Sequence, residues 1–81
     1  MKTNKTPKQT TVREFPPVGG KYRVRILEDA DTRTKCLDIR EYVVSPDVFE
    51  GFTRRGVRLG DLAQVELLRD ALSEVLRDML L

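Results

Sequence analysis

The sequence predicts an α+β domain in which a four-stranded antiparallel sheet is followed by one long amphipathic C-terminal helix. Apolar and basic side chains alternate over residues 21–27, the pattern of a strand with one buried face. Clusters of Pro, Gly, Asp and Ser separate this segment from its neighbours and predict turns. After residue 61 the apolar residues recur at every third or fourth position, which predicts the helix. A chain of 81 residues has room for one core and therefore for a single domain.

The N-terminal residues 1–10 are polar and rich in Lys and Thr. They hold too few apolar side chains to offset the entropy lost on ordering, so we expect a disordered basic tail over 1–10 and the folded domain over 11–81. Residues 11–15 predict a short edge strand, and the prolines and glycines of residues 16–20 predict the turn that ends it.

Two longer strands follow. Residues 21–27 predict a strand with its apolar side chains toward the core and its basic side chains toward solvent. The apolar set is Tyr22, Val24 and Ile26, and the basic set is Lys21, Arg23 and Arg25. The polar residues 28–32 predict a turn. Residues 35–44 predict a strand that ends before Pro46, because proline has no N–H for the strand ladder, and the two strands should pair as an antiparallel hairpin.

The segment after this hairpin, residues 47–53, is expected to be a loop that carries Phe49 and Phe52. Such phenylalanines either fill gaps in a small core or offer rings to a ligand, and the sequence leaves both roles open. Residues 54–59 then predict the fourth strand, since apolar and basic side chains alternate again toward its end.

The helix has a clear start signal at Asp61, a typical N-cap residue, and Gln64 three positions later fits a capping box. Its apolar stripe consists of Leu62, Val65, Leu68, Leu72, Val75, Leu76 and Met79. A column of acidic residues at i,i+4 spacing comprises Glu66, Asp70, Glu74 and Asp78. Like charges at this spacing repel one another, so the helix must be stabilised by burial of its apolar stripe.

Two kinds of partner for that stripe are open: the protein's own sheet alone, or the sheet together with a second chain. The spacing also fits the seam between two packed helices, and a domain of this size has only a marginal core. We therefore expect a homodimer whose interface includes Val65, Leu68, Leu72, Val75 and Met79.

The composition argues against catalysis and metal binding. The chain has no His and a single cysteine, Cys36, so it lacks an imidazole base, a disulfide framework and a Cys/His zinc site. Cys36 lies within an alternating strand and is expected to be a small buried side chain. Asp38 and Glu41 have opposite strand parity, and Arg40 between them indicates ion pairing rather than acid–base chemistry. We expect no enzyme activity, no catalytic residue, no metal and no cofactor.

The basic residues indicate a polyanionic partner. Residues 1–25 carry a net charge of +6, whereas residues 61–81 carry −3. Basic side chains on three predicted strands would form rows across the sheet, as in a nucleic-acid-binding platform. They are Lys21, Arg23, Arg25, Lys35, Arg40, Arg54, Arg55 and Arg58. The alternative is a solvated surface without a ligand, although most of the set are arginines, which bind phosphate in bidentate fashion and stack on bases.

Two motifs carry a family resemblance. Residues 37–42 (LDIREY) and, after a loop, residues 54–59 (RRGVRL) precede the amphipathic helix. In this order they resemble the C-terminal domain of the transcriptional coactivator positive cofactor four family, over about residues 21–76. The resemblance implies a curved four-stranded antiparallel sheet with one helix, a homodimer joined through helices and sheets, and single-stranded DNA bound across the paired sheets. The serine-rich arm of the eukaryotic members is absent, which suggests a bacterial or phage relative.

The resemblance also implies DNA-contacting residues. Arg40 matches a DNA-contacting arginine of the family, Arg54 and Arg55 match a basic pair before a glycine, and Lys21 matches a basic residue that opens the second strand. The family commonly has a tryptophan at the position of Val43 here, so stacking would fall to Phe52 or Tyr22. The predicted DNA-binding set is Lys21, Arg23, Arg25, Arg33, Lys35, Arg40, Phe52, Arg54 and Arg55.

These observations predict a largely sequence-independent single-stranded DNA-binding protein that acts in transcription, as a transcriptional coactivator, or in DNA maintenance. RNA and melted duplex are further candidate ligands, and transcription or replication proteins are candidate partners. The alternative is a protein-interaction module that docks a partner through its C-terminal helix and has no nucleic-acid role. No apolar run approaches the roughly 20 residues of a membrane span, so we expect a protein away from membranes, cytoplasmic and nucleoid-associated if bacterial, nuclear if eukaryotic.

Overall fold

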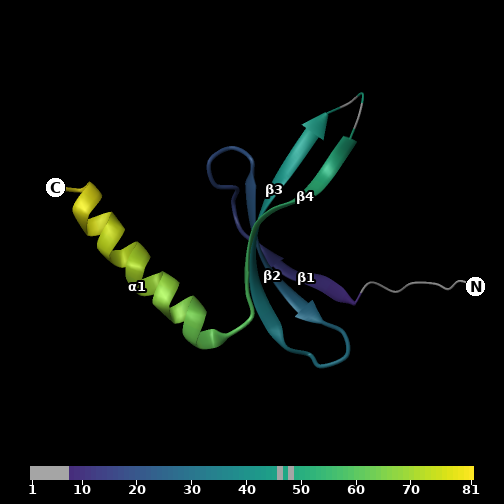
Figure 1. Ribbon diagram of the computed structural model, residues 1–81, viewed down its shortest axis with the longest axis horizontal. Coiled ribbons are helices and arrows are strands. Elements are labelled where there is room, and N and C mark those ends of the chain that lie inside the picture. The colour runs from purple at the N-terminus through teal and green to yellow at the C-terminus, as the bar shows by residue number, and fades with distance from the viewer. Residues whose placement is uncertain (1–7, 46, 48) are drawn as a thin grey trace, which may run out of the picture.

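The structure is a computed structural model that describes residues 8–45, 47 and 49–81. It shows a four-stranded antiparallel sheet followed by one helix, which confirms the predicted α+β class and the order of the elements (Figure 1). The elements are β1 (Gln9–Glu14), β2 (Tyr22–Asp29), β3 (Lys35–Ser45), β4 (Phe49–Leu59) and α1 (Leu62–Met79). Each strand pairs with the next one along the chain, in the order β1-β2-β3-β4.

The first strand begins earlier than predicted. Gln9 pairs with Asp29 and Thr10 pairs with Glu28, so the expected disordered tail over residues 1–10 extends too far. An edge strand needs only one ladder of backbone hydrogen bonds, and polar side chains exposed to solvent do not oppose it. The folded domain therefore starts before residue 11, and the prediction for residues 1–7 lies outside the described residues.

The hairpin of β2 and β3 is the longest uninterrupted ladder, from Tyr22 opposite Glu41 to Glu28 opposite Lys35. The predicted turn over residues 28–32 starts later, because β2 continues to Asp29. The Asp29 carboxylate accepts hydrogen bonds from the backbone N–H groups of residues 31 and 32, at 2.8 and 3.0 Å. This is the local side-chain bonding that makes Asp common in turns.

The fourth strand is longer than predicted, since it already starts at Phe49. Residues 49–53, which were expected in a loop, belong to β4; residues 49–52 pair with the end of β3, and Phe52 lies opposite Tyr42. The prediction was wrong because Gly51 weakens the strand pattern in the sequence, whereas the extended end of β3 supplies a partner ladder.

A bulge interrupts the β3–β4 ladder. Between the pairs Arg40–Gly56 and Tyr42–Phe52, β3 has one residue, Glu41, where β4 has residues 53–55. At Gly56 (φ +153°) a Cβ atom would collide with the carbonyl oxygen of the residue before Arg40. Glycine is therefore required for the close approach of the two strands here, and the bulge carries residues 54 and 55 out of the regular ladder.

The sheet has two chemically different faces. Side chains directly opposite each other on paired strands share a face, and the pairs Val24–Ile39 and Leu37–Leu59 build one face that is apolar. This apolar face lies toward α1. Asp61 caps the helix as predicted, because its side chain accepts a hydrogen bond from the N–H of residue 63 at 3.0 Å.

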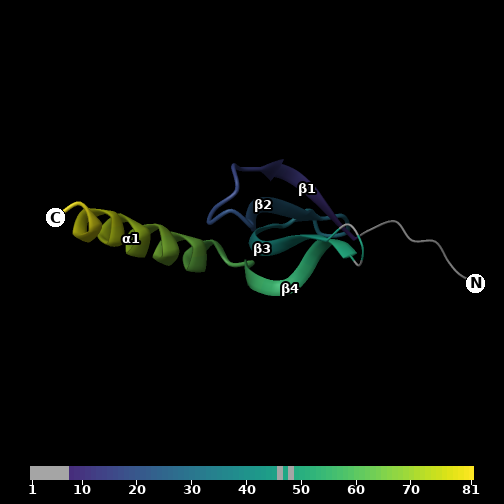
Figure 2. The same cartoon turned by 90° about the horizontal axis from the view of Figure 1, so that it is seen from above.

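The helix extends away from the sheet instead of lying flat on it (Figures 1 and 2). Val65 and Leu68 are half-buried, whereas the rest of α1 is exposed. Leu27 is the one fully buried hydrophobic side chain of the described residues. An open apolar groove of about 560 Å³ separates helix and sheet, lined by residues that include Val24, Ile39 and Leu72. The core of the single chain is thus incomplete.

No helix in the part described is long and apolar enough to cross a membrane.

Candidate nucleic-acid interface

The opposite face of the sheet gathers arginines from three strands. Arg23 pairs with Arg40, Arg25 with Asp38, and Asp38 in turn with Arg58, so all five side chains share one face. We call this the arginine face, and it also carries Tyr42 and Phe52. Four of the eight basic side chains expected to form rows across the sheet lie on this face: Arg23, Arg25, Arg40 and Arg58.

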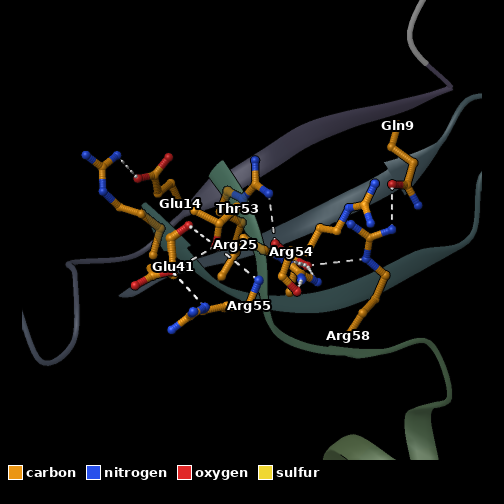
Figure 3. A network of polar contacts seen from close by, with 11 residues as sticks. Gln9, Glu14, Arg25, Glu41, Thr53, Arg54, Arg55 and Arg58 are labelled. Atoms are coloured by element: carbon orange, nitrogen blue, oxygen red, sulfur yellow. Dashed lines mark hydrogen bonds and ion pairs between the residues drawn. The ribbon is translucent and has the colours of Figure 1, made fainter. Parts of the chain in front are cut away.

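Asp38 lies at the centre of the arginine face, and its side chain is 0% exposed. Its Oδ2 atom accepts a hydrogen bond from Arg25 Nη2 at 2.8 Å. Its Oδ1 atom accepts from Arg40 Nη2 at 2.9 Å and from Arg58 Nε at 3.3 Å (Figure 3). Three guanidinium groups surround one carboxylate, so the arginine cluster of Arg25, Arg40 and Arg58 keeps a positive excess.

This surrounding charge decides how Asp38 ionises. Burial by itself favours the neutral acid, but the hydrogen bonds from Arg40 and Arg25, the charge of Arg40 and the hydrogen bond from Arg58 outweigh it. The pKa of Asp38 is therefore lowered below its ordinary value of 3.8. The carboxylate stays charged at neutral pH and holds the cluster together.

The three arginines differ in how much of their side chain is accessible. Arg25 is 13% exposed and Arg40 14%, whereas Arg58 is 44% exposed. Arg40 Nη1 also donates to the backbone oxygen of Arg54 at 2.7 Å, and Arg58 Nη1 donates to the Gln9 side chain at 3.0 Å. The cluster is therefore fixed from β1 to β4, with Arg58 as its most accessible member.

Two aromatic rings pack onto the arginines. The Arg25 guanidinium carbon lies 3.7 Å from the centre of the Phe52 ring, and that of Arg23 lies 4.1 Å from the Tyr42 ring. The rings are 4.9 Å apart with an angle of 76° between their planes. Arginine over an aromatic face gains cation–π attraction, so cation and ring hold each other in place.

The aromatic pair differs in part from the prediction. Phe52 lies on the arginine face, but Tyr22 alternates with Arg23 and lies on the other face. Tyr42 takes the second position, which sequence reasoning missed. Its signal was present, because Tyr42 follows Asp38 and Arg40 at two-residue intervals along β3.

Lys21 and Arg55 gather at a separate carboxylate, Glu41. Lys21 Nζ lies 3.3 Å and Arg55 Nε 3.9 Å from Glu41, and the Thr53 hydroxyl donates to it at 3.0 Å. The hydrogen bonds from Thr53 and Lys21 lower the pKa of Glu41. Glu41 lies opposite Tyr22 and so has the other parity from Arg40, which means that the predicted DNA-binding set does not share one surface.

Arg33 and Lys35 lie at the turn between β2 and β3, where they pair with Glu28 at 3.0 and 3.9 Å. Both are well exposed.

Arg54 is exposed at the bulge, and within the described residues its side chain forms no ion pair. Arg23 pairs with Glu14 at 3.1 Å. Cys36, expected to be a buried side chain, is only half-buried.

The predicted dimer-interface residues all lie on α1. Val65, Leu68 and Leu72 line the groove toward the sheet. Val75 and Met79 lie further along the helix and are exposed. No group of three or more metal-ligating side chains occurs among residues 8–45, 47 and 49–81.

Comparisons with protein-family models, curated proteins and solved structures find no match to this chain. The resemblance to the positive cofactor four family therefore stays a prediction, and the functional argument depends on the geometry of the arginine face.

Proposed function

We propose that the protein is a homodimer that binds single-stranded DNA through the arginine face of its sheet, with little sequence preference. One observation carries this proposal: arginines of β2, β3 and β4 share a face with two aromatic rings. Proteins that bind single strands without sequence preference combine cations along the backbone path with rings on which bases stack.

The rings favour single strands over duplex. Phe52 is partly exposed on the arginine face, and Tyr42 lies beside it. A base can stack on such a ring only when its own face is free, which is the case in a single strand or a melted segment. Nothing in this arrangement requires deoxyribose, so RNA is a second ligand class for the same surface.

The carboxylates on the arginine face reduce the positive charge that is available to bind phosphates. Arg23 is balanced by Glu14, and one charge of the arginine cluster is balanced by Asp38. Arg54 at the bulge adds exposed charge next to the cluster, because its backbone oxygen accepts a hydrogen bond from Arg40 at 2.7 Å. If about three or four phosphates are neutralised, the slope of log K against log salt for a single strand is about −2 to −3.

The incomplete core supports the proposed homodimer. The apolar stripe of α1 and the apolar face of the sheet leave an open groove between them. A second copy that inserts its own stripe would cover both surfaces, and the two-fold dimer would carry two arginine faces. We place the activity in transcription, as a coactivator, or in DNA maintenance.

A second candidate function is favoured by the same groove. The exposed stripe of α1 would also dock an amphipathic helix of a different protein, and the arginines would then serve solubility. In that case the protein is an interaction module, and it should not distinguish single-stranded DNA from duplex.

The test is fluorescence anisotropy with labelled single-stranded DNA, duplex DNA and RNA of one length at two salt concentrations. We expect single strands to bind more tightly than duplex, with affinity falling as salt rises. Arg58→Ala should weaken binding, whereas Arg77→Ala, which removes the same charge from the last turn of α1, should not. Equal weakening by both variants, or no binding by the wild type, would refute the proposal.

A further inference from the structure

We infer that Asp38 is a positioning residue for nucleic-acid binding: its carboxylate holds Arg25 and Arg58 in the orientation in which they meet a phosphate. This inference rests on the function proposed above. By its charge alone, a carboxylate at the centre of this surface would repel a polyanion and weaken binding.

The three arginines of the cluster differ in how many of their guanidinium nitrogens already donate hydrogen bonds within the protein. All three nitrogens of Arg40 are engaged, Nε and Nη2 with Asp38 and Nη1 with the backbone oxygen of Arg54. Arg40 thus ties the cluster to β4. Arg25 uses Nη2 on Asp38, and Arg58 uses Nε on Asp38 and Nη1 on Gln9. Within the described residues, three nitrogens have no hydrogen-bond partner: Arg25 Nε, which is buried, Arg25 Nη1 and Arg58 Nη2.

The unpaired Arg25 Nη1 and Arg58 Nη2 belong to side chains that Asp38 restrains. Its two oxygens take hydrogen bonds from β2, β3 and β4 at once, and its side chain is 0% exposed, so water does not compete for them. The Arg25 guanidinium also packs on the Phe52 ring, 3.7 Å from the ring centre. An arginine that is already ordered loses less conformational entropy when it binds, so the preformed cluster binds a phosphate more tightly than free arginines would.

The two possible roles of Asp38, charge balance and positioning, predict opposite changes in DNA affinity for one substitution. Asp38→Asn keeps the shape of the side chain and makes the arginine face more positive by one charge. If Asp38 only balances charge, this variant binds single-stranded DNA more tightly than the wild type. If Asp38 positions the arginines, the variant binds more weakly, because an amide supplies one acceptor oxygen in place of two.

The same face offers a matched control. Glu14 lies opposite Arg25 in the sheet and forms an ion pair with Arg23 at 3.1 Å, but its side chain is 39% exposed. Glu14→Gln therefore removes an equal charge from the same face without removing a buried acceptor. Its expected effect is the purely electrostatic one, binding that is equal to or tighter than that of the wild type.

The experiment measures the dissociation constants of the wild type, Asp38→Asn and Glu14→Gln for a labelled single-stranded oligothymidylate at two salt concentrations. We expect Asp38→Asn to weaken binding about tenfold, or about 1.4 kcal/mol, while Glu14→Gln does not weaken it. Binding by folded Asp38→Asn that equals or exceeds the wild type would overturn the inference. Absence of binding by the wild type would instead refute the proposed function, so the two failures are distinguishable.

A measurement on the wild type covers the case in which Asp38→Asn does not fold. In the ¹⁵N-labelled protein without DNA, the Nε–Hε signals of Arg40 and Arg58 should be separately resolved and should exchange slowly with water. Addition of DNA should shift the signal of Arg58 more than that of Arg40. Arginine signals that are averaged in the free protein, and become separate only with DNA, would show that the cluster is not preformed and would overturn the inference.

Discussion

Replacement of Leu72 by Asp tests whether a second chain covers the apolar stripe of α1. Leu72 lines the groove beside the sheet, yet 51% of it is exposed in the single chain. In a monomer the new carboxylate can turn toward water, and the substitution loses only the stabilisation from the buried half of the leucine side chain. In a dimer the carboxylate must enter the interface.

The free-energy cost of Leu72→Asp is much larger if the residue lies in a dimer interface. Full burial of a leucine gives about 1.5–3 kcal/mol, so burial of the exposed half of Leu72 in a dimer gives about 1 kcal/mol. A carboxylate without a partner adds at least about 2 kcal/mol of desolvation cost. A two-fold interface contains the change twice, which makes the total about 6 kcal/mol, or about a ten-thousand-fold higher dissociation constant.

Analytical ultracentrifugation at micromolar concentration provides the assay, with circular dichroism to follow folding. The wild type should sediment as a dimer, and Leu72→Asp should be a monomer or lose its structure. Ala63→Asp is the control, because residue 63 is exposed on α1 and does not line the groove. A wild type that is a stable folded monomer, or a Leu72→Asp variant that remains a dimer, would refute the reasoning.

Three further predictions follow from the sheet. Gly56→Ala should lower the free energy of unfolding by about 2 kcal/mol or more in a denaturant titration, because its Cβ collides with the backbone of β3; an unchanged midpoint would contradict this. The double change Arg54→Ala with Arg55→Ala should reduce the salt slope of single-stranded DNA binding by about 0.7 per lost phosphate contact, without loss of fold; unchanged affinity at both salt concentrations would remove these residues from the DNA path. The lowered pKa values of Asp38 and Glu41 mean that the unfolded chain takes up protons first, near their ordinary values of 3.8 and 4.5. The melting temperature should therefore hold from neutral pH to about 4.5 and fall as the pH drops toward the lowered values; a rise on acidification would contradict this sign.

The sequence predicted those parts of the fold that depend on local pattern. Alternation over residues 21–27 set the β2–β3 hairpin, and the cap at Asp61 set the start of α1. Residues 49–53 were missed because their strand depends on the partner ladder of β3 and not on their own composition. Gln9 and Thr10 were missed for the same reason, since β2 supplies their hydrogen bonds.

The candidate site was predicted in part. Strand parity placed Arg23 and Arg25 on one face, the family resemblance matched Arg40 to a DNA-contacting arginine, and Phe52 was predicted as a ring for stacking. Neither could show that one buried carboxylate, Asp38, collects three guanidiniums, because this depends on the register of three strands at once. The bulge in β4 likewise separates Arg55 from the arginine cluster and turns it toward a different carboxylate.

The most direct test of the central claim is a nuclear magnetic resonance titration of the ¹⁵N-labelled protein with a single-stranded oligothymidylate. It shows where on the protein the strand binds. We predict saturable shifts of backbone amides along the arginine face, centred on Arg23, Tyr42 and Arg58, with the acidic column of α1 around Glu74 unchanged. Shifts confined to α1, or no shifts at DNA concentrations well above that of the protein, would contradict the account.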